Sequence, residues 1–270
     1  MPFYRLAIPF IALLLLSIYL TIEVSETWAM LIVFLVVVLL SGLIMSPVIN
    51  WWWWKRFPPD LPKELHAMLE HKVPFYQKLD QEDRREFRRR IFLFGQGTNF
   101  MEQGLDKIPE DAKLMMSVAP VSMGFNDETF LFENFENIVF YPHPFPSPQH
   151  PEKLHTSEIY EDDGVLMFSL QHILRGYLEP QKFFNSAWYE YARIYLMTYP
   201  DRNYGDWSLV SWQQLEQISG FSNEALEKWV GLPNLNKDAF TLAFYFLHPQ
   251  RFQKGLPKMF DSLHLIFDSK

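Results

Sequence analysis

The chain of 270 residues contains no cysteine. Thiolates form disulfides, act as nucleophiles and ligate zinc, so their absence excludes all three kinds of chemistry. A basic excess is missing as well, because 24 Lys and Arg stand against 32 Asp and Glu, for a net charge of −8. Surfaces that bind nucleic acid are rich in Lys and Arg, so we expect no nucleic-acid partner.

Sequence motifs of several enzyme classes are also absent. The chain has no glycine-rich phosphate loop, no Gly-x-Ser-x-Gly turn and no pair of histidines four residues apart. His143, His150 and His155 lie in a proline-rich stretch and are interpreted as surface loop residues, with convergence on a metal ion as the alternative. Glu158 and the acidic run 161–163 are interpreted in the same way, as solvated loop residues.

Two long apolar stretches occupy the beginning of the chain, at residues 4–22 and 28–49. Each has about the 20 residues that a helix needs to cross the hydrocarbon core of a bilayer. The linker 23–27 is short, so the two helices must be antiparallel. Four consecutive tryptophans at 51–54 are typical of an aromatic belt at the membrane interface. We therefore expect a two-helix transmembrane hairpin over residues 1–54, with the lipid bilayer as its partner.

The distribution of basic residues predicts the orientation of this hairpin. Arg5 precedes the first stretch, Lys55 and Arg56 follow the second, and the loop between them has no Lys or Arg. The positive-inside rule then places both ends of the hairpin, and the large C-terminal part, in the cytoplasm. We expect a multi-pass protein of the inner (cytoplasmic) membrane. A cleaved signal peptide is the alternative, but no small-x-small cleavage site follows the first stretch.

For the remaining chain, the sequence predicts a proline-rich linker over 55–62 and a helix-rich α+β domain over 63–270. Helices are expected at 63–69, at 80–94 with Asp80 as N-cap, at 109–116 and over most of the chain after 183. Strands are expected at 138–141 and 164–170. Five arginines between 84 and 90 alternate with acids, which favours a solvated helix face over contact with anionic lipid.

Five segments, in their order and spacing, give the domain its resemblance to a known family. They are LPKELHAMLEHKVPFY (61–76), IVFYP (138–142), ILRG (173–176), NSAWYEYARIYL (185–196) and HPQRFQKGLPKMFDSLHLIF (248–267). Together they resemble the Mlc titration factor A family of zinc-dependent peptidases, over residues 58–268. The resemblance implies a zincin-like fold, and it implies that such proteins can engage other proteins.

Members of this family carry His-Glu-x-x-His on one helix and a further glutamate ligand on a later helix. Two histidines four residues apart hold Zn²⁺, and the glutamate between them is the general base. The matching residues here are Tyr189, Glu190 and Arg193, and the later ligand position falls at Ala243. The resemblance therefore implies that Glu190 is a vestige of catalysis, that the metal ligands are lost and that no cofactor is held. A guanidinium is permanently charged and cannot ligate a metal.

Three functional hypotheses follow from these residues. The first is a membrane-anchored cytoplasmic pseudopeptidase that binds a protein or peptide in the old cleft. Arg193 would then pair with Glu190, or would receive an anion such as a peptide C-terminus. The second is an active zinc-dependent peptidase, with a metal site rebuilt from His, Asp or Glu beside Glu190. The third is a scaffold whose spans associate through residues such as Ser41 and Gly42.

Overall fold

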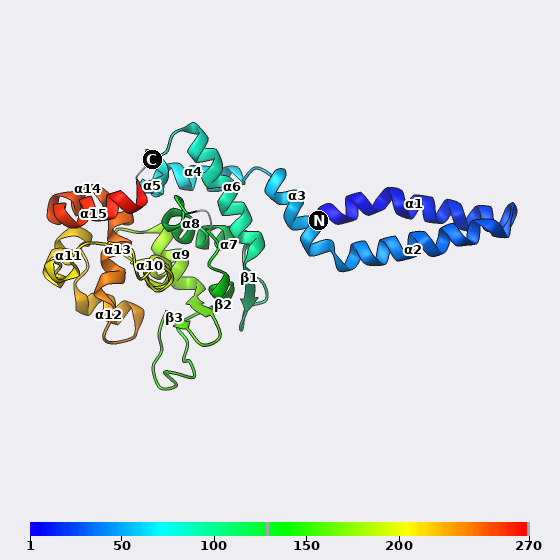
Figure 1. Ribbon diagram of the computed structural model, residues 1–270. Coiled ribbons are helices and arrows are strands. Elements are labelled where there is room, and N and C mark those ends of the chain that lie inside the picture. The colour runs from blue at the N-terminus through cyan, green and yellow to red at the C-terminus, as the bar shows by residue number, and fades with distance from the viewer. Residues whose placement is uncertain (128–129, 269–270) are drawn as a thin grey trace. The chain divides into compact units, whose positions relative to one another are not determined.

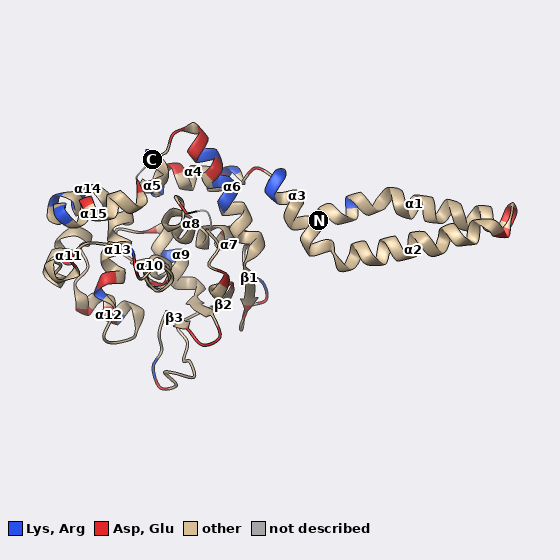
Figure 2. Ribbon diagram, in the orientation of Figure 1, with Lys and Arg blue, Asp and Glu red and all other residues tan. Residues whose placement is uncertain are grey.

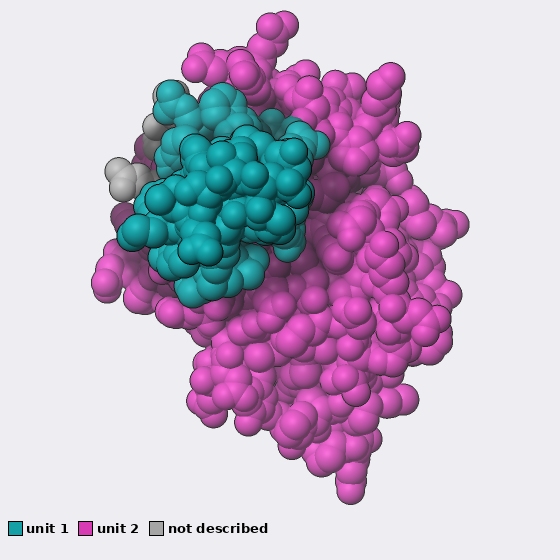
Figure 3. Space-filling view, turned by 90° about the vertical axis from the view of Figure 1, so that its right-hand side faces the viewer, with its two compact units in different colours: residues 1–59 teal, residues 60–270 magenta. Residues whose placement is uncertain are grey.

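The computed structural model describes residues 1–127 and 130–268. It divides into two compact units, Met1–Pro59 and Asp60–Lys270, which Figure 3 draws in different colours. The domain expected over 63–270 thus ends with two residues outside the described part.

The first unit consists mainly of two apolar helices, α1 (Pro2–Glu23) and α2 (Ala29–Ile44). They are joined by the short 3-10 helix η1 (Glu26–Trp28) and run antiparallel (Figure 1). By length and composition, the segments Pro2–Glu23 and Glu26–Ile44 can each cross a membrane. Charged residues lie at the turn between the helices (Figure 2). In a hairpin that crosses a membrane, the turn is outside the hydrocarbon core, where charge is tolerated.

The second apolar helix is shorter than its sequence suggests. It ends at Ile44 instead of Ile49, and a separate helix, α3 (Ser46–Arg56), begins two residues later. Pro47 in the first turn of α3 has no N–H to donate, and its ring clashes with the carbonyl of the preceding turn. The four tryptophans at 51–54 therefore lie within α3, after the break.

Polar and small residues hold the open end of the hairpin together. The side chain of Asn50 is buried, and its Oδ1 accepts a hydrogen bond from the backbone N–H of Phe3 at 2.8 Å. Gly42 faces the Phe3 ring, and a Cβ at this position would lie 2.9 Å from Phe3 Cε2. Gly42 thus permits close packing inside the hairpin. The scaffold hypothesis would instead need Gly42 on an outer face.

The second unit is helix-rich with a small sheet, which confirms the α+β class. The strands are β1 (Asn99–Glu102), β2 (Asn137–Tyr141), β3 (Ser157–Tyr160) and β4 (Val165–Ser169), in the spatial order β1-β2-β4-β3. The first three in this order are parallel, and β3 is antiparallel to β4. β2 and β4 lie where strands were expected, but β1 and β3 were missed because each has only four residues of mixed polarity.

Helices pack around this sheet. They are α4 (Lys63–Lys72), α5 (Pro74–Lys78), α6 (Gln81–Gly97), α7 (Glu110–Met116), α8 (Val118–Met123), α9 (Leu170–Leu178), α10 (Ser186–Thr198), α11 (Trp212–Ser219), α12 (Asn223–Val230), α13 (Lys237–Leu247), α14 (Pro249–Gly255) and α15 (Pro257–Phe267), with 3-10 turns η2 (Glu133–Phe135) and η3 (Trp207–Leu209). Asp80 caps α6 as expected, since its Oδ1 accepts from the N–H of Asp83 at 2.8 Å. Arg89 and Arg90 both pair with Glu86 on α6, in keeping with a mixed-sign helix face.

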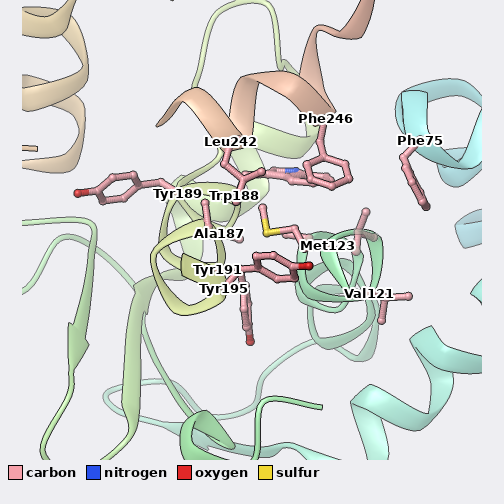
Figure 4. Packing of buried hydrophobic residues seen from close by; sticks show 14 of the residues in the cluster. Phe75, Val121, Met123, Ala187, Trp188, Tyr189, Tyr191, Tyr195, Leu242 and Phe246 are labelled. Atoms are coloured by element: carbon pink, nitrogen blue, oxygen red, sulfur yellow. The ribbon is translucent and has the colours of Figure 1, made fainter. Parts of the chain in front are cut away.

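The central helix α10 packs against several other elements of the second unit. Nearly all of its residues from Ser186 to Tyr195 are buried. Trp188 packs on Phe246 of α13 with ring centroids 5.6 Å apart, and Tyr191 packs on Phe94 of α6. Figure 4 shows that Tyr189 points away from both of these side chains. The helix thus gives one face to the core and turns a second face toward β3.

Candidate functional site

A buried carboxylate on α10 is the centre of the candidate site. Asn185 begins the helix, and its Oδ1 accepts from the N–H of Ala187 at 3.0 Å. Five residues later, Glu190 is only 1% exposed. A charged group so far from water is costly to bury unless it is paired and hydrogen-bonded. The partners of Glu190 therefore determine what this site can do.

Each oxygen of Glu190 has one partner. The hydroxyl of Ser157, on β3, donates to Oε1 at 2.7 Å. Arg193, one turn further along α10, donates from Nη1 to Oε2 at 2.9 Å. A weaker contact joins Arg193 Nη2 to the exposed Glu161, at 3.5 Å. The expected pairing of Arg193 with Glu190 is thus present within α10. The bond from Ser157 to Glu190 ties the helix to the edge of the sheet.

Glu190 and Arg193 each favour the charged form of the other. Burial raises the pKa of Glu190, while the charge of Arg193 and the hydrogen bonds from Ser157 and Arg193 act against that shift. Burial also disfavours the Arg193 cation, but the attraction and hydrogen bond of Glu190, together with Tyr189 and Glu161, outweigh it, so the pKa of Arg193 is raised. Without the guanidinium, Glu190 would be a carboxyl group in an apolar interior and would favour its neutral form.

Tyr189 is occupied by packing and hydrogen bonding. Its ring stacks on Phe240 of α13 with centroids 4.3 Å apart, and its oxygen accepts from the backbone N–H of Asn236 at 3.1 Å. Burial and the nearby Glu190 raise the pKa of Tyr189 to about 12, so its hydroxyl is neutral at pH 7. The Arg193 guanidinium lies 5.8 Å from the centre of this ring. By the spacing of the motif, Tyr189 is the residue expected at the position of a histidine.

Ala243 lies on α13, the helix that packs against α10 through Tyr189 and Phe240. It is fully buried and follows Phe240 by three residues, so the two share one side of the helix. The structure thus brings Tyr189, Glu190 and Arg193 together around one cavity. Ala243 is on the neighbouring helix but does not line that cavity.

The cavity beside these residues has a volume of about 320 Å³. Its walls come from α10, from Glu158 and Ile159 of β3 and from the connection 230–236 between α12 and α13. Because β3 is the last strand in the sheet order, the cavity runs beside a sheet edge. Cavities of this size fall at the lower end of the range for small-molecule and peptide side-chain pockets.

Two residues interpreted as exposed are in fact buried beside this cavity. Glu158 is 3% exposed, and His155 is fully buried with Nε2 3.1 Å from Glu158 Oε2. His150 Nε2 lies 3.6 Å from the other oxygen of Glu158, whereas His143 pairs with Gln171 instead. The interpretation as solvated loop residues is therefore wrong for Glu158 and His155. The error follows from the missed strand β3, which carries Glu158 inward.

This second cluster has its own charge balance. Burial opposes ionisation of Glu158, but hydrogen bonds from His155 and Ser147 and the charges of both histidines together lower its pKa. The other ring nitrogen of His155, Nδ1, lies 3.0 Å from the carbonyl oxygen of Lys153, which can only accept. Both nitrogens of His155 thus face acceptors, and a metal would have to displace one of these hydrogen bonds.

The residues of the site do not fit the zinc ion that the motif implies. A permanent cation, Arg193, stands one turn from Tyr189, and neither side chain offers a lone pair suited to Zn²⁺. Among residues 1–127 and 130–268, no group of three or more His, Asp or Glu side chains is arranged to hold a metal ion.

Comparison with known proteins gives one match. The family model of the glucose-regulated metallo-peptidase M90 matches residues 50–192, which is more than half of the 270 residues. The match includes Tyr189 and Glu190 and ends one residue before Arg193. Searches of curated proteins and of solved structures found no match. On the strength of the family model, the chain belongs to the glucose-regulated metallo-peptidase M90 family, the Mlc titration factor A family that its motifs resemble.

Proposed function

We propose that this protein is a membrane-anchored pseudopeptidase, which binds a protein or peptide segment in a cleft that no longer holds zinc. One observation carries the proposal: the Arg193 guanidinium is ion-paired to Glu190, at 2.9 Å, where the family chemistry needs a metal ligand. A general base must be able to take a proton from metal-bound water. Here both oxygens of Glu190 are engaged by Ser157 and Arg193 instead.

The energetics of this ion pair explain why it would resist metal. Removing a charged partner from a buried pair costs about 3–5 kcal/mol, because the other charge stays buried without compensation. A zinc ion entering beside Glu190 would have to displace Arg193 or bind next to its positive charge. The pair therefore supports a metal-free site on a framework that we take to be zincin-like.

The cavity beside the pair supports the binding role. It is bounded by the edge strand β3 and contains groups of both signs, namely Arg193, Glu158 and Glu190. An extended peptide can add to a sheet edge through its main chain, while neighbouring pockets select its side chains. We infer that the partner is an extended protein segment laid along β3.

The apolar hairpin supports a membrane location for this module. Two helices long and apolar enough to span a bilayer precede the soluble unit, and basic residues flank them at Arg5 and Lys55-Arg56. We infer that the hairpin holds the second unit at the cytoplasmic face of the inner membrane, where its partner must be presented.

A second candidate function is that of an active zinc-dependent peptidase. His150 and Glu158 line the same cavity as Glu190, and His155 contacts Glu158, so a His and Glu cluster does lie beside the old general base. The buried Oε1 of Glu158 makes no hydrogen bond. On this hypothesis, His150 and Glu158 would turn toward a zinc ion and rebuild an active peptidase.

The first prediction separates the two candidates. The full chain in phosphatidylcholine nanodiscs is exposed to zinc, desalted and analysed by mass spectrometry, then mixed with a library of random decapeptides. We expect far less than one zinc per chain, because Arg193 repels the metal. We also expect intact peptides to stay bound to the protein. Leu235→Arg, which places a long cation in the cavity wall, should lose retention. Leu154→Arg, at an exposed site outside the lining, should keep it.

Two results would count against the pseudopeptidase. Stoichiometric zinc that is lost in His150→Ala, together with newly cleaved peptides, would establish the rebuilt peptidase. Peptides that are neither retained nor cleaved would remove the binding role.

The second prediction concerns the ion pair itself. Arg193→Ala should destabilise the protein by on the order of 3 kcal/mol at pH 8, because Glu190 stays buried as an uncompensated anion. The raised pKa of Glu190 gives stability that is present at low pH and is lost as pH rises above the reference value of 4.5. Loss of Arg193 raises this pKa further, so the destabilisation should be smaller at pH 5 than at pH 8.

Urea denaturation followed by near-UV circular dichroism measures this difference. The double variant Arg193→Ala with Glu190→Gln is the control, and it should lose the added pH dependence because the carboxyl group is gone. An equal loss of stability at both pH values in Arg193→Ala would show that Glu190 does not depend on this cation.

The third prediction tests the membrane anchor. In a bacterial host, the full chain should stay in the membrane pellet after carbonate extraction, and a variant lacking residues 1–56 should become extractable. A C-terminal alkaline phosphatase fusion should be inactive, because that enzyme needs the oxidising periplasm. An active fusion, or a product shortened after the first apolar segment, would contradict the cytoplasmic hairpin and favour a signal peptide.

A further inference from the structure

The Arg193 guanidinium has hydrogen-bond donors that Glu190 does not use. Its Nη1 donates to Glu190 Oε2 at 2.9 Å, and its Nη2 donates to Glu161 Oε1 at 3.5 Å. In the part of the chain that the structure describes, no other group accepts from this side chain. A guanidinium carries more N–H donors than these two bonds use. Arg193 can therefore hold a further acceptor while it stays paired with Glu190.

These donors are open to a ligand. The side chain of Arg193 is 25% exposed, whereas that of Glu190 is 1% exposed. Arg193 also lines the cavity of about 320 Å³ beside β3. Because Glu190 is buried, the part of the guanidinium that solvent reaches is the part turned away from this partner.

The bond from Arg193 to Glu161 is the weaker of the two. Glu161 directly follows β3, and its side chain is 58% exposed. At 3.5 Å the contact is longer than a strong N–H···O bond. Water screens an ion pair at such an exposed site, so the pair contributes little to stability. A carboxylate that enters the cavity can therefore replace Glu161 at small cost.

This replacement needs no movement of the backbone. Glu161 begins the turn between β3 and β4, where the N–H of Gly164 donates to the Glu161 carbonyl at 3.2 Å. Gly164 has a φ of 60°, and a Cβ there would lie 1.9 Å from the carbonyl oxygen of Asn134. The turn is thus held against the segment 133–135. Release of Arg193 requires only a rotation of the exposed Glu161 side chain, which is a fast motion.

The surrounding charges limit what can take the place of Glu161. Glu158 and Glu190 also line the cavity, so an additional negative charge would be repelled. A single carboxylate that displaces Glu161 leaves the number of negative charges around Arg193 unchanged. A phosphate group carries more charge and would add to the repulsion.

We propose that the segment bound along β3 carries a carboxylate, which displaces Glu161 from Arg193. The inference rests on the proposed peptide-binding function and names the chemistry of the partner. An Asp or Glu side chain and a C-terminal carboxylate have the same chemistry, since each can accept two parallel bonds from a guanidinium. Glu161 is then an internal competitor, which an acidic segment replaces and a neutral segment does not.

Three pools of random decapeptides, built from Ala, Ser, Thr, Val, Leu and Tyr with acetylated N-termini, test this proposal. The first pool has one Glu at a random position and an amidated C-terminus. The second has Gln in place of Glu, and the third has Gln and a free C-terminal carboxylate. Each pool is mixed with the full chain in phosphatidylcholine nanodiscs, and retained peptides are measured by mass spectrometry. We expect the first pool to be retained at least roughly fivefold more than the second.

The third pool identifies the source of the carboxylate. Retention of the third pool alone above the second would support a carboxylate at Arg193 and assign it to the end of a chain. Equal retention of all three pools would overturn the inference and leave peptide binding intact. Retention of none would remove the proposed binding function, and this inference with it.

Matched variants test the displacement of Glu161. Glu161→Gln removes the competitor and should raise retention of the Glu pool by roughly threefold, with no change for the Gln pool. Asp162→Asn removes an equal charge from the next exposed residue, which makes no ion pair with Arg193, and should have a smaller effect. The double variant Glu190→Gln with Arg193→Ala should lose the preference for Glu. Equal effects of Glu161→Gln and Asp162→Asn, or a preference that survives in a folded double variant, would overturn the inference.

Discussion

The buried ion pair between Glu190 and Arg193 is the interaction on which the candidate site depends. A carboxylate that is 1% exposed is tolerable here because Ser157 and Arg193 satisfy both of its oxygens. The bond from Ser157 also joins α10 to β3, the edge of the sheet. The pair therefore has a structural consequence and a chemical one. It borders a cavity, and it places a permanent cation where we propose that the family motif has a histidine.

The three faces of α10 show how one helix serves several purposes. Trp188 and Tyr191 belong to the aromatic core, while Tyr189, Glu190 and Arg193 border the cavity along β3. The start of the helix, at Asn185, borders a second cavity with a different character. The first cavity has charges of both signs and lies along a sheet edge, which suits an extended peptide. The second is lined mainly by apolar and aromatic residues.

Local patterns in the sequence were sufficient for much of the fold. The apolar hairpin, the Asp80 cap and the strands around Val139 and Met167 are signalled by residues close together in the chain. The break at Pro47 was also visible, but the apolar run on both sides of it concealed the helix end. β1 and β3 were missed because four residues such as Ser-Glu-Ile-Tyr carry no clear alternation.

The candidate site could be predicted only in part, for a related reason. The pairing of Arg193 with Glu190 is a contact within one helix turn, so spacing alone indicated it. The bond from Ser157 to Glu190 joins residues 33 positions apart, and the burial of His155 and Glu158 depends on the unpredicted strand. No local pattern reveals such contacts. The family match covers Glu190 but neither Arg193 nor Ala243, so the assignment of these two positions rests on motif spacing.

Restoration of the metal site tests this assignment most directly. In the full chain, Tyr189→His, Arg193→His and Ala243→Glu are combined, and the zinc content is measured after loading and desalting beside the wild-type chain. Our account predicts about one zinc per chain in the triple variant, and far less in the wild type, because the ligand types of the family motif are then restored on α10 and α13. A folded triple variant that binds no more zinc than the wild type would contradict the claim that these residues mark a lost metal site.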